Sequence, residues 1–288
     1  RASRVAVAEF EANYGSGGTE TFIREHILGN FYAFELMMAP YAVGHMKMGF
    51  VLDELGHRLT DKERLNFYLT NSLEVEELEQ TQFPIMSSLA EESRLAGQVK
   101  RDKPILVIFG NPPYFGHSAN KGRWIREKIE DYKQVDGRPL GEKNPKWLQD
   151  DYVKFLRFAQ WKMEQVPRGM VGMITNHSYL DNPTFRGMRQ SLMQTFDTIH
   201  ILNIHGNSLK KETTPDGGKD ENVFDIQQGV CIGIFIKIPN SKRKCQIHYA
   251  DLWGDRKSKY DTLNKKDLKK TKFTRVKPAA PSYLFIAQ

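Results

Sequence analysis

The sequence has few cysteines and no long apolar run. Its 288 residues include two cysteines, Cys231 and Cys245, whose spacing fits neither a metal site nor a redox pair. Disulfide bonds are therefore not expected, and a reducing, cytoplasmic environment fits this composition. No stretch approaches the ~20 apolar residues that a membrane-spanning helix needs. The composition thus argues against both a disulfide-rich secreted domain and a membrane protein.

The chain also lacks an initiating methionine and a signal-peptide pattern, since it begins Arg1-Ala2-Ser3-Arg4. We expect it to be an excerpt of a longer polypeptide. The net charge of +7 and the pI near 9.2 favour a polyanionic partner. Ten of the basic residues lie between Arg256 and Lys277, against two acidic ones. This stretch is either a solvated lysine-rich face or a surface that contacts phosphates.

The tetrapeptide Asn111-Pro112-Pro113-Tyr114 follows a short apolar run, residues 105–109. Such a run ending in a proline-stiffened turn predicts a buried strand that delivers a rigid loop to the carboxyl edge of a sheet, where α/β folds bind ligands. Consecutive prolines fix φ and remove two backbone donors. Asn111 and the Pro112 carbonyl can accept hydrogens from an amino group on a flat ring, and Tyr114 can stack on it. The pattern suits a flipped-out base; a stiffened surface turn is the plainer interpretation.

Several sequence blocks, taken in order, extend this interpretation to most of the chain. They are Phe22–Leu28, Phe34–Val43, Tyr68–Leu73, Phe109–Tyr114 and Asn222–Val230, followed by Tyr283–Phe285 near the end. With these blocks the chain resembles the S-adenosylmethionine-dependent DNA methyltransferases that methylate amino groups, in which Asn-Pro-Pro-Tyr is the catalytic motif. It resembles most the adenine methyltransferase region of Type I single-polypeptide restriction-modification enzymes.

The resemblance implies a function for the tetrapeptide. Asn111, Pro112, Pro113 and Tyr114 would be the catalytic residues of an adenine N6-methyltransferase that flips its target base out of double-stranded DNA. S-adenosylmethionine would be the methyl donor, and no metal would be needed. The parent polypeptide would also carry nuclease, helicase and specificity domains. Neither cysteine follows a proline, which argues against methylation at cytosine carbon 5, where a cysteine nucleophile is required.

The same resemblance assigns residues to the methyl donor. Glu35, at the end of a predicted strand, matches the acid that binds the ribose, and Asn71, after the next strand, would reach the donor's adenine. A helix-start acid and a turn-forming Asn are the plainer interpretations. Gly15 to Gly18 imitates the family's glycine-rich loop without its Asp-Pro. Either this loop is degenerate or the true loop precedes Arg1; we favour the second, which leaves the first strand outside the sequence.

Periodicity predicts an α/β fold with a mostly parallel sheet and an antiparallel late strand. The resemblance implies that this is a Rossmann-like S-adenosylmethionine-dependent methyltransferase fold. A long mobile loop is expected between Tyr114 and Pro145. A boundary near residue 240 would separate a catalytic core, 1–240, from a basic extension, 241–288, leading toward a specificity module. The expected strands are 31–36, 64–70, 105–110, 169–175, 198–204, 229–238 and 244–252, and the expected helices 19–28, 40–55, 86–99, 146–164 and 183–196.

Two alternative functions stay open. Protein glutamine N5-methyltransferases also use Asn-Pro-Pro-Tyr, but they are compact and place the motif late, whereas more than half of this chain follows it. The chain could also be an inactive DNA-binding fragment without a working donor site. The residue that covers the second face of the base is open, with Phe224 a candidate. His205, Asn207, Lys210 and Lys211 are expected in an exposed polar loop, which either contacts the DNA backbone or, as the plainer interpretation, is only solvated.

Overall fold

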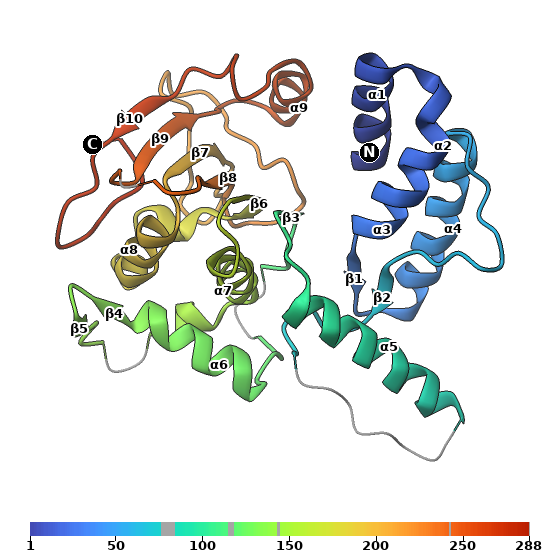
Figure 1. Cartoon of the computed structure of the whole chain (residues 1–288). Coiled ribbons are helices and arrows are strands. Elements are labelled where there is room, and N and C mark those ends of the chain that lie inside the picture. The colour runs from blue at the N-terminus through green and yellow to red at the C-terminus, as the bar shows by residue number, and fades with distance from the viewer. Residues whose placement is uncertain (76–83, 115–117, 143–144, 242, 288) are drawn as a thin grey trace. The chain divides into compact units, whose positions relative to one another are not determined.

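The computed structural model describes residues 1–75, 84–114, 118–142, 145–241 and 243–287, without the side chains of 84–89. The chain forms two compact units, Arg1–Lys103 and Pro104–Gln288 (Figure 1). In the described part, no helix is both long and apolar enough to cross a membrane. The division expected near residue 240 concerns function and stays a prediction.

Unit 1 is a helical unit with a small parallel sheet. Its core is formed by apolar side chains such as Val7, Ile23, Ile27 and Leu52, which helical spacing brings onto facing sides of the helices. Its elements are α1 (Ala2–Tyr14), α2 (Thr19–Phe22), a π-helical turn (Ile23–Ile27), α3 (Leu28–Asn30), β1 (Ala33–Glu35), α4 (Met38–Glu54), β2 (Phe67–Leu69) and α5 (Pro84–Asp102).

Unit 2 holds a larger sheet with helices packed against it (Figure 1). Its elements are β3 (Val107–Gly110), α6 (Arg123–Ile129), β4 (Gln134–Val135), β5 (Arg138–Pro139), α7 (Asp151–Glu164), β6 (Gly169–Asn176), α8 (Arg186–Thr195), β7 (Thr198–His205), β8 (Val230–Lys237), β9 (Gln246–Asp251), α9 (Arg256–Lys265) and β10 (Thr274–Val276). Short 3-10 helices precede α7 and α8 (Lys146–Gln149, Pro183–Phe185) and follow α6 and β6 (Glu130–Lys133, His177–Leu180).

The main sheet has the strand order β10-β9-β7-β8-β6-β3. β3 is parallel to β6, and β7 is parallel to β9. β8 is antiparallel to both β6 and β7, so these two run the same way, and β10 is antiparallel to β9. The carboxyl ends of β3, β6, β7 and β9 therefore share one edge of the sheet. The predicted α/β fold with a mostly parallel sheet and an antiparallel late strand is confirmed.

β3 differs from its prediction as a buried strand. Val107 is 52% exposed and Phe109 is 70% exposed. The reason is its place in the sheet: among the described residues β3 pairs with β6 alone, which makes it an edge strand. The expectation that a further strand of the fold lies outside the sequence stays a prediction.

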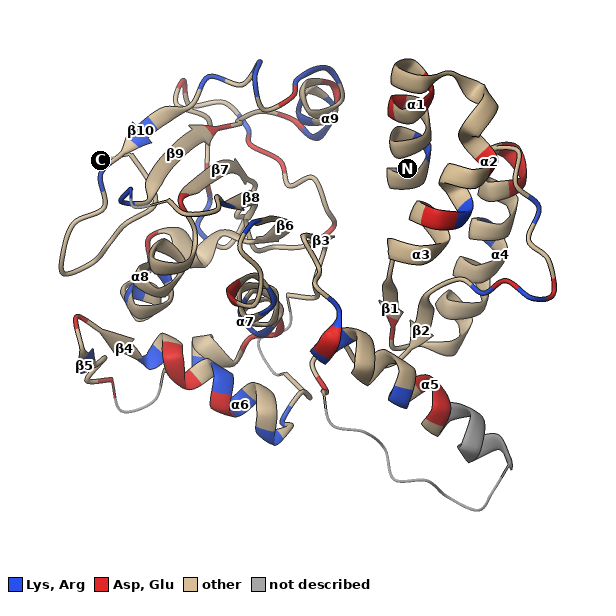
Figure 2. Cartoon of the chain, in the orientation of Figure 1, with Lys and Arg blue, Asp and Glu red and all other residues tan. Residues whose placement is uncertain are grey.

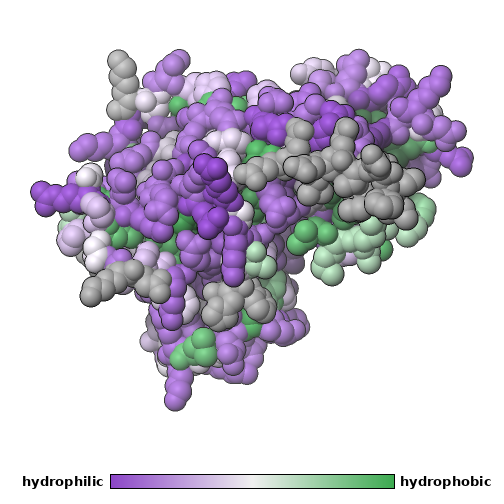
Figure 3. All heavy atoms as spheres, turned by 90° about the horizontal axis from the view of Figure 1, so that it is seen from below, coloured by the Kyte–Doolittle hydropathy of each residue, from purple (hydrophilic) through white to green (hydrophobic). Residues whose placement is uncertain are grey.

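Unit 1 also exposes large apolar side chains around the end of β1 and on α4. Leu36 is 66% exposed, Met37 63% and Phe50 63%. The face of the molecule in Figure 3 is mostly hydrophilic, with apolar patches between the polar side chains.

The prediction of one long loop after Tyr114 was wrong. Residues 123–139 form α6, a 3-10 turn and the β4–β5 hairpin. The apolar residues Ile125, Ile129 and Tyr132, spaced by four and three, are buried to 1% exposure or less and fix this segment to the core. Charged residues between them hid this helical period in the sequence.

The basic segment near the end of the chain folds into unit 2 and adds an α-helix and a strand that the sequence did not predict. β9 and β10 extend the main sheet, and α9 lies between them in sequence. Lys and Arg residues colour much of the α9 ribbon blue in Figure 2. One of them, Lys259, is completely buried, so this segment is not simply a solvated lysine-rich face.

Candidate functional site

Asn111 directly follows β3 and so lies at the carboxyl edge of the main sheet. Its side chain is exposed, whereas Pro112 behind it is buried. The Tyr114 hydroxyl lies 2.6 Å from Asn111 Oδ1 and 3.0 Å from the carbonyl oxygen of Ile174 in β6. The hydroxyl has one proton, which the two oxygens share, with the shorter distance to Asn111. Because β6 is fixed in the sheet, this contact ties the amide of Asn111 to a rigid neighbour. Asn111 thus presents its amide in a defined position at the edge where α/β folds bind ligands.

The ring of Tyr114 is partly buried and packs on two apolar clusters. One is the main core of unit 2; the other, which we call the edge cluster, is formed by the buried side chains Ile204, Val223 and Val230. Burial, with a smaller contribution from Cys231, raises the pKa of the Tyr114 hydroxyl, so it stays protonated and can donate. The structure therefore gives Tyr114 a packing role and a hydrogen-bonding role beside the predicted stacking on a base.

Glu35 and Asn71 lie at the carboxyl ends of neighbouring parallel strands in unit 1. Glu35 ends β1, opposite Leu69 of β2, and its Oε1 accepts the N–H of Met37 at 2.9 Å. Asn71 forms a turn in which its Oδ1 accepts the N–H of Leu73 at 3.1 Å. The structure thus brings Glu35 and Asn71 to one edge of the unit 1 sheet, while Asn111 to Tyr114 belong to unit 2.

A buried lysine that the sequence did not single out holds the turn after β2. Lys100 is 2% exposed and donates to Thr70 Oγ1 at 2.8 Å and to the carbonyls of Asn71 and Glu74 at 2.7 and 2.8 Å. Burial, partly offset by Glu74, lowers its pKa to about 8. Lys100 thereby fixes the loop that carries Asn71.

Gly15 to Gly18 does not follow a strand. The residues before it form α1, and Gly15 ends that helix with φ 78°, in the left-handed region that glycine adopts without strain. A glycine-rich loop that cradles a cofactor in this fold class sits between a strand and a helix. Within the described residues, this segment is a turn between two helices and does not have the position of a cofactor loop.

Polar side chains that are hydrogen-bonded to one another lie at the carboxyl ends of β6, β7 and β9. His177 pairs with Asn203 at 3.1 Å and with Asn207 at 3.2 Å, one partner for each ring nitrogen. His205 Nε2 lies 2.7 Å from Asp251 Oδ1. A ring nitrogen of His177, a ring nitrogen of His205 and a carboxylate oxygen of Glu212 lie within 4.8 Å of one another, as the ligands of a metal ion would. Because both nitrogens of His177 already have amide partners, this arrangement is described best as a hydrogen-bonding network.

The expected exposure of this region was wrong for two residues. His205 and Asn207 are 5% and 6% exposed, because the segment after β7 folds back over the strand ends. Lys210 and Lys211 are exposed, as expected. His205 has φ 59° and lies at an irregularity in the β7–β8 pairing, which turns its side chain toward Asp251.

The buried position of His205 predicts a pH dependence of stability. Burial alone would lower the pKa of His205, but hydrogen bonds and charges from Asp251 and Glu212 outweigh it and raise the pKa. The stabilisation that protonated His205 contributes to the folded state is therefore full below the pKa of ~6.5 that His205 has in the unfolded chain. It is lost as the pH rises through the higher pKa of His205 in the folded protein. We expect His205→Gln to lose less stability than the wild type over this rise.

Urea unfolding between about pH 6 and about pH 9 measures this difference. His177, whose pKa is lowered chiefly by burial and in part by the charge of His205, is replaced by Gln in both proteins so that its titration does not enter the comparison. Equal pH slopes for the two proteins would show that His205 is not held as a cation.

The segment between β7 and β8, residues 206–229, covers the edge cluster. Phe224 and Ile226 pack on this cluster, as Tyr114 does. A cavity of about 630 Å³ opens along the segment, and Gly206, Phe224, Ile226 and Arg256 are among the residues that line it. The structure therefore places Phe224, which the sequence suggested as a second wall for a base, on the same apolar cluster as Tyr114.

Comparisons with known proteins bear on this geometry. The chain matches no family model. Over 107 residues, 37% of the chain, it is 28% identical to the Type II methyltransferase M.BanIII of Aneurinibacillus aneurinilyticus, of which the match covers 16%. Among solved structures, the ATP-dependent Type ISP restriction-modification enzyme LlaBIII bound to DNA matches 99% of the chain at 25% identity, with a TM-score of 0.79. The predicted resemblance is confirmed.

Two further structures share the fold at lower sequence identity. A nuclease-deletion mutant of the Type ISP enzyme LlaGI, in complex with a DNA substrate mimic, matches 95% of the chain at 20% identity and a TM-score of 0.75. The DrdV–DNA complex matches 94% at 24% identity and a TM-score of 0.71. The chain spans 19% of the LlaBIII chain, 23% of the LlaGI chain and 26% of the DrdV chain.

Proposed function

We propose that this chain is the catalytic region of a site-specific DNA adenine methyltransferase in a restriction-modification system. It would transfer a methyl group from S-adenosylmethionine to adenine N6. The observation that carries the proposal is the position of Asn111 to Tyr114 directly after β3, with the Asn111 amide held by the Tyr114 hydroxyl. The similarity to M.BanIII and LlaBIII supports it, since the first is named a methyltransferase and the second a restriction-modification enzyme.

Asn111 and Pro112 would act as paired acceptors for the exocyclic amino group of a flipped adenine. An amide oxygen has two lone pairs, so Asn111 Oδ1 can accept from the Tyr114 hydroxyl and from the adenine at the same time. Accepting both amino hydrogens shifts electron density toward the nitrogen lone pair. This lone pair would attack the methyl carbon as the bond from that carbon to the donor sulfur breaks, and the amino group would then lose one proton. Catalysis then rests on positioning and preorganised dipoles, without a covalent enzyme intermediate.

Glu35 and Asn71 are the residues proposed to hold the methyl donor. The chemistry of this pair fits an adenosine group: a carboxylate can accept from both ribose hydroxyls, and an amide can pair with an adenine edge. The bond from the Met37 N–H keeps the Glu35 carboxylate at the end of β1, and Lys100 fixes the loop of Asn71. When bound, S-adenosylmethionine supplies the methyl group.

Double-stranded DNA is the proposed partner, in keeping with the net charge of +7. LlaBIII and the LlaGI mutant were solved with DNA or a DNA mimic, and the chain matches about a fifth of each polypeptide. We propose that the parent polypeptide of this chain adds nuclease, helicase and specificity domains. A cytoplasmic location belongs to the same proposal.

Methyl-transfer assays with the full-length protein test the proposed function. The protein is incubated with S-adenosylmethionine labelled in its methyl group, together with double-stranded DNA or with a protein extract. We expect the label in DNA. Label in protein glutamine would favour the glutamine methyltransferase alternative. DNA binding without any label transfer would favour an inactive DNA-binding role.

A further inference from the structure

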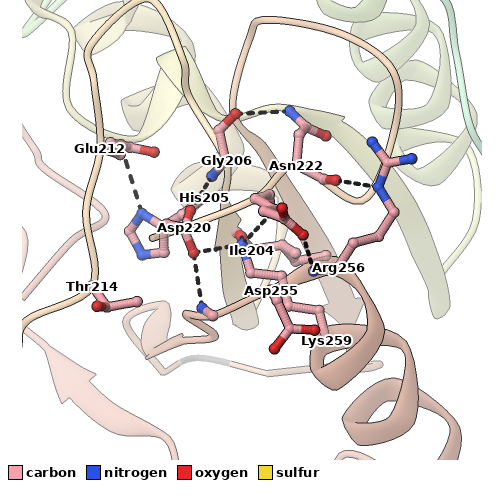
Figure 4. A network of polar contacts seen from close by, with 12 residues as sticks. Ile204, His205, Gly206, Glu212, Thr214, Asp220, Asn222, Asp255, Arg256 and Lys259 are labelled. Atoms are coloured by element: carbon pink, nitrogen blue, oxygen red, sulfur yellow. Dashed lines mark hydrogen bonds and ion pairs between the residues drawn. The ribbon is translucent and has the colours of Figure 1, made fainter. Parts of the chain in front are cut away.

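One face of α9 binds the backbone that carries Phe224. The carbonyl oxygens of residues 221–224, four in a row, each accept a hydrogen bond from an α9 side chain. Lys259 Nζ donates to the carbonyl of Glu221 at 2.7 Å, and the Tyr260 hydroxyl donates to that of Val223 at 2.5 Å. The Arg256 guanidinium donates to the carbonyls of Asn222 and Phe224 at 2.8 and 3.1 Å. Figure 4 shows Arg256 and Lys259 extending from the helix toward this segment. The helix therefore holds a stretch of irregular backbone that belongs to none of the strands in the described part of the chain.

A completely buried ion pair anchors this contact. Lys259 Nζ lies 2.7 Å from Asp220 Oδ1, and both side chains are 0% exposed. The same carboxylate accepts the N–H of Gly206 at 2.7 Å and of Gly254 at 2.9 Å, and Lys259 also donates to the carbonyl of Ile204 at 2.7 Å (Figure 4). The pair thus joins the end of β7, the start of the 206–229 segment and the turn before α9. A buried ion pair whose polar groups all have hydrogen-bond partners favours one arrangement of the segments around it over the alternatives.

Asn222 closes the segment from the inside. Its amide nitrogen donates to the carbonyls of Gly206 at 3.0 Å and Gln228 at 2.7 Å, and its oxygen accepts the N–H of Phe224 at 2.8 Å. Gly206 has φ 83°, and a side chain there would place a Cβ 2.4 Å from Asn222 Cα. The two ends of the 206–229 segment are therefore tied together close to Phe224, so the backbone on both sides of this ring is fixed.

We propose that α9 is a positioning element of the methyl-transfer site, in which Arg256 and Lys259 hold residues 221–224 so that Phe224 forms the second wall of the pocket for the target base. This proposal rests on the proposed function. Phe224 and Tyr114 pack on the same edge cluster, Phe224 from a segment held by α9 and Tyr114 from the loop after β3. Arg256 pairs with Asp225 at 2.8 Å and Lys259 with Asp220 at 2.7 Å, and both also donate to backbone carbonyls of residues 221–224. Because these partners all lie within the protein, the two residues act on the base through Phe224. A wall held in place before binding costs less ordering free energy when the base enters.

Arg256→Ala in the full-length protein is the main test, because the Arg256 side chain is 40% exposed and its loss should spare the fold. Two DNAs are used: one carries 2-aminopurine in place of the target adenine, and its fluorescence reports an unstacked or restacked base. The other keeps the target adenine and serves to measure kcat, because 2-aminopurine lacks the N6 amino group that is methylated. We expect an altered fluorescence in the complex and a fall in kcat of ~10-fold or more, since a small misplacement can cost that much. DNA affinity should change less than kcat. Arg256→Lys should recover part of the rate.

The matched control is Lys257→Ala, which removes an exposed charge from the neighbouring position on the same helix. If α9 acts by phosphate contact, Lys257→Ala and Arg256→Ala will both weaken DNA binding and share a reduced salt dependence, which would overturn the positioning role. If Arg256→Ala keeps wild-type kcat and 2-aminopurine signal, the positioning role is also overturned. A wild-type protein that transfers no methyl group would refute the proposed function itself, which the variants do not address.

A second variant separates positioning from loss of fold. Lys259→Met combined with Asp220→Asn removes the buried pair without leaving an unpaired charge. Hydrogen exchange of the amides of residues 221–229 is measured beside the melting temperature. We expect exchange to rise ~10-fold or more in this segment, with the sheet strands still protected. Unchanged exchange in 221–229 would show that α9 does not hold the segment.

Discussion

Replacing Asn111 with alanine is expected to abolish adenine methylation while leaving binding of the methyl donor largely intact. The proposed acceptor for the amino group is Asn111 Oδ1, which the Tyr114 hydroxyl holds at 2.6 Å. Loss of a positioned transition-state acceptor costs ~3 kcal/mol, so less than about a hundredth of the wild-type rate should remain. Single-turnover methylation by the full-length protein measures this rate.

Calorimetry with S-adenosylmethionine is the control for Asn111→Ala. The residues proposed for the donor, Glu35 and Asn71, lie in unit 1, whereas Asn111 lies in unit 2. A normal donor affinity with an abolished rate is the expected pair of results. Residual activity well above a hundredth would mean that Asn111 is not the acceptor.

Replacing Tyr114 with alanine is expected to lower kcat/KM by a factor that corresponds to a loss of ~1–3 kcal/mol in transition-state stabilisation. This is the value of stacking an aromatic ring on a base. Tyr114→Phe keeps the ring but loses the hydroxyl that holds Asn111, so we expect a smaller loss of about 1 kcal/mol, that of one hydrogen bond. Steady-state methylation of the two variants against the wild type measures both losses.

A mismatch or abasic site opposite the target adenine separates stacking from packing. If Tyr114 stacks on the flipped base, the loss in Tyr114→Ala should shrink on such DNA, because less pairing energy opposes flipping. The ring also packs on the edge cluster, so the melting temperature of this variant should fall in either case. A rate loss that is insensitive to the mismatch would assign Tyr114 to packing alone.

The sequence predicted those parts of the site that depend on local pattern. The apolar run before Asn111 and the proline turn after it place the motif at a strand end, and β1 and β2 end where Glu35 and Asn71 were expected. Strand runs and turns of this kind involve residues close in sequence, so their signals are complete within a short window. This is why the positions of these strands were predicted better than the exposure of their side chains.

The features that the sequence missed depend on contacts between distant residues. Lys259 is one lysine in a basic stretch, and its burial depends on Asp220, which lies far back in the chain. The exposure of β3 depends on which strands lie beside it, and the burial of His205 depends on how the 206–229 segment folds back. Patterns of neighbouring residues carry none of this information.

The chemical position of the transferred methyl group tests the central claim most directly. DNA modified by the full-length protein, in a host without DNA methyltransferases of its own, is digested to nucleosides and separated by mass spectrometry. If Asn111 is an acceptor for the amino group of adenine, the wild-type protein will produce N6-methyladenine and Asn111→Ala will not. Finding N4-methylcytosine, or N6-methyladenine made equally well by Asn111→Ala, would contradict the account.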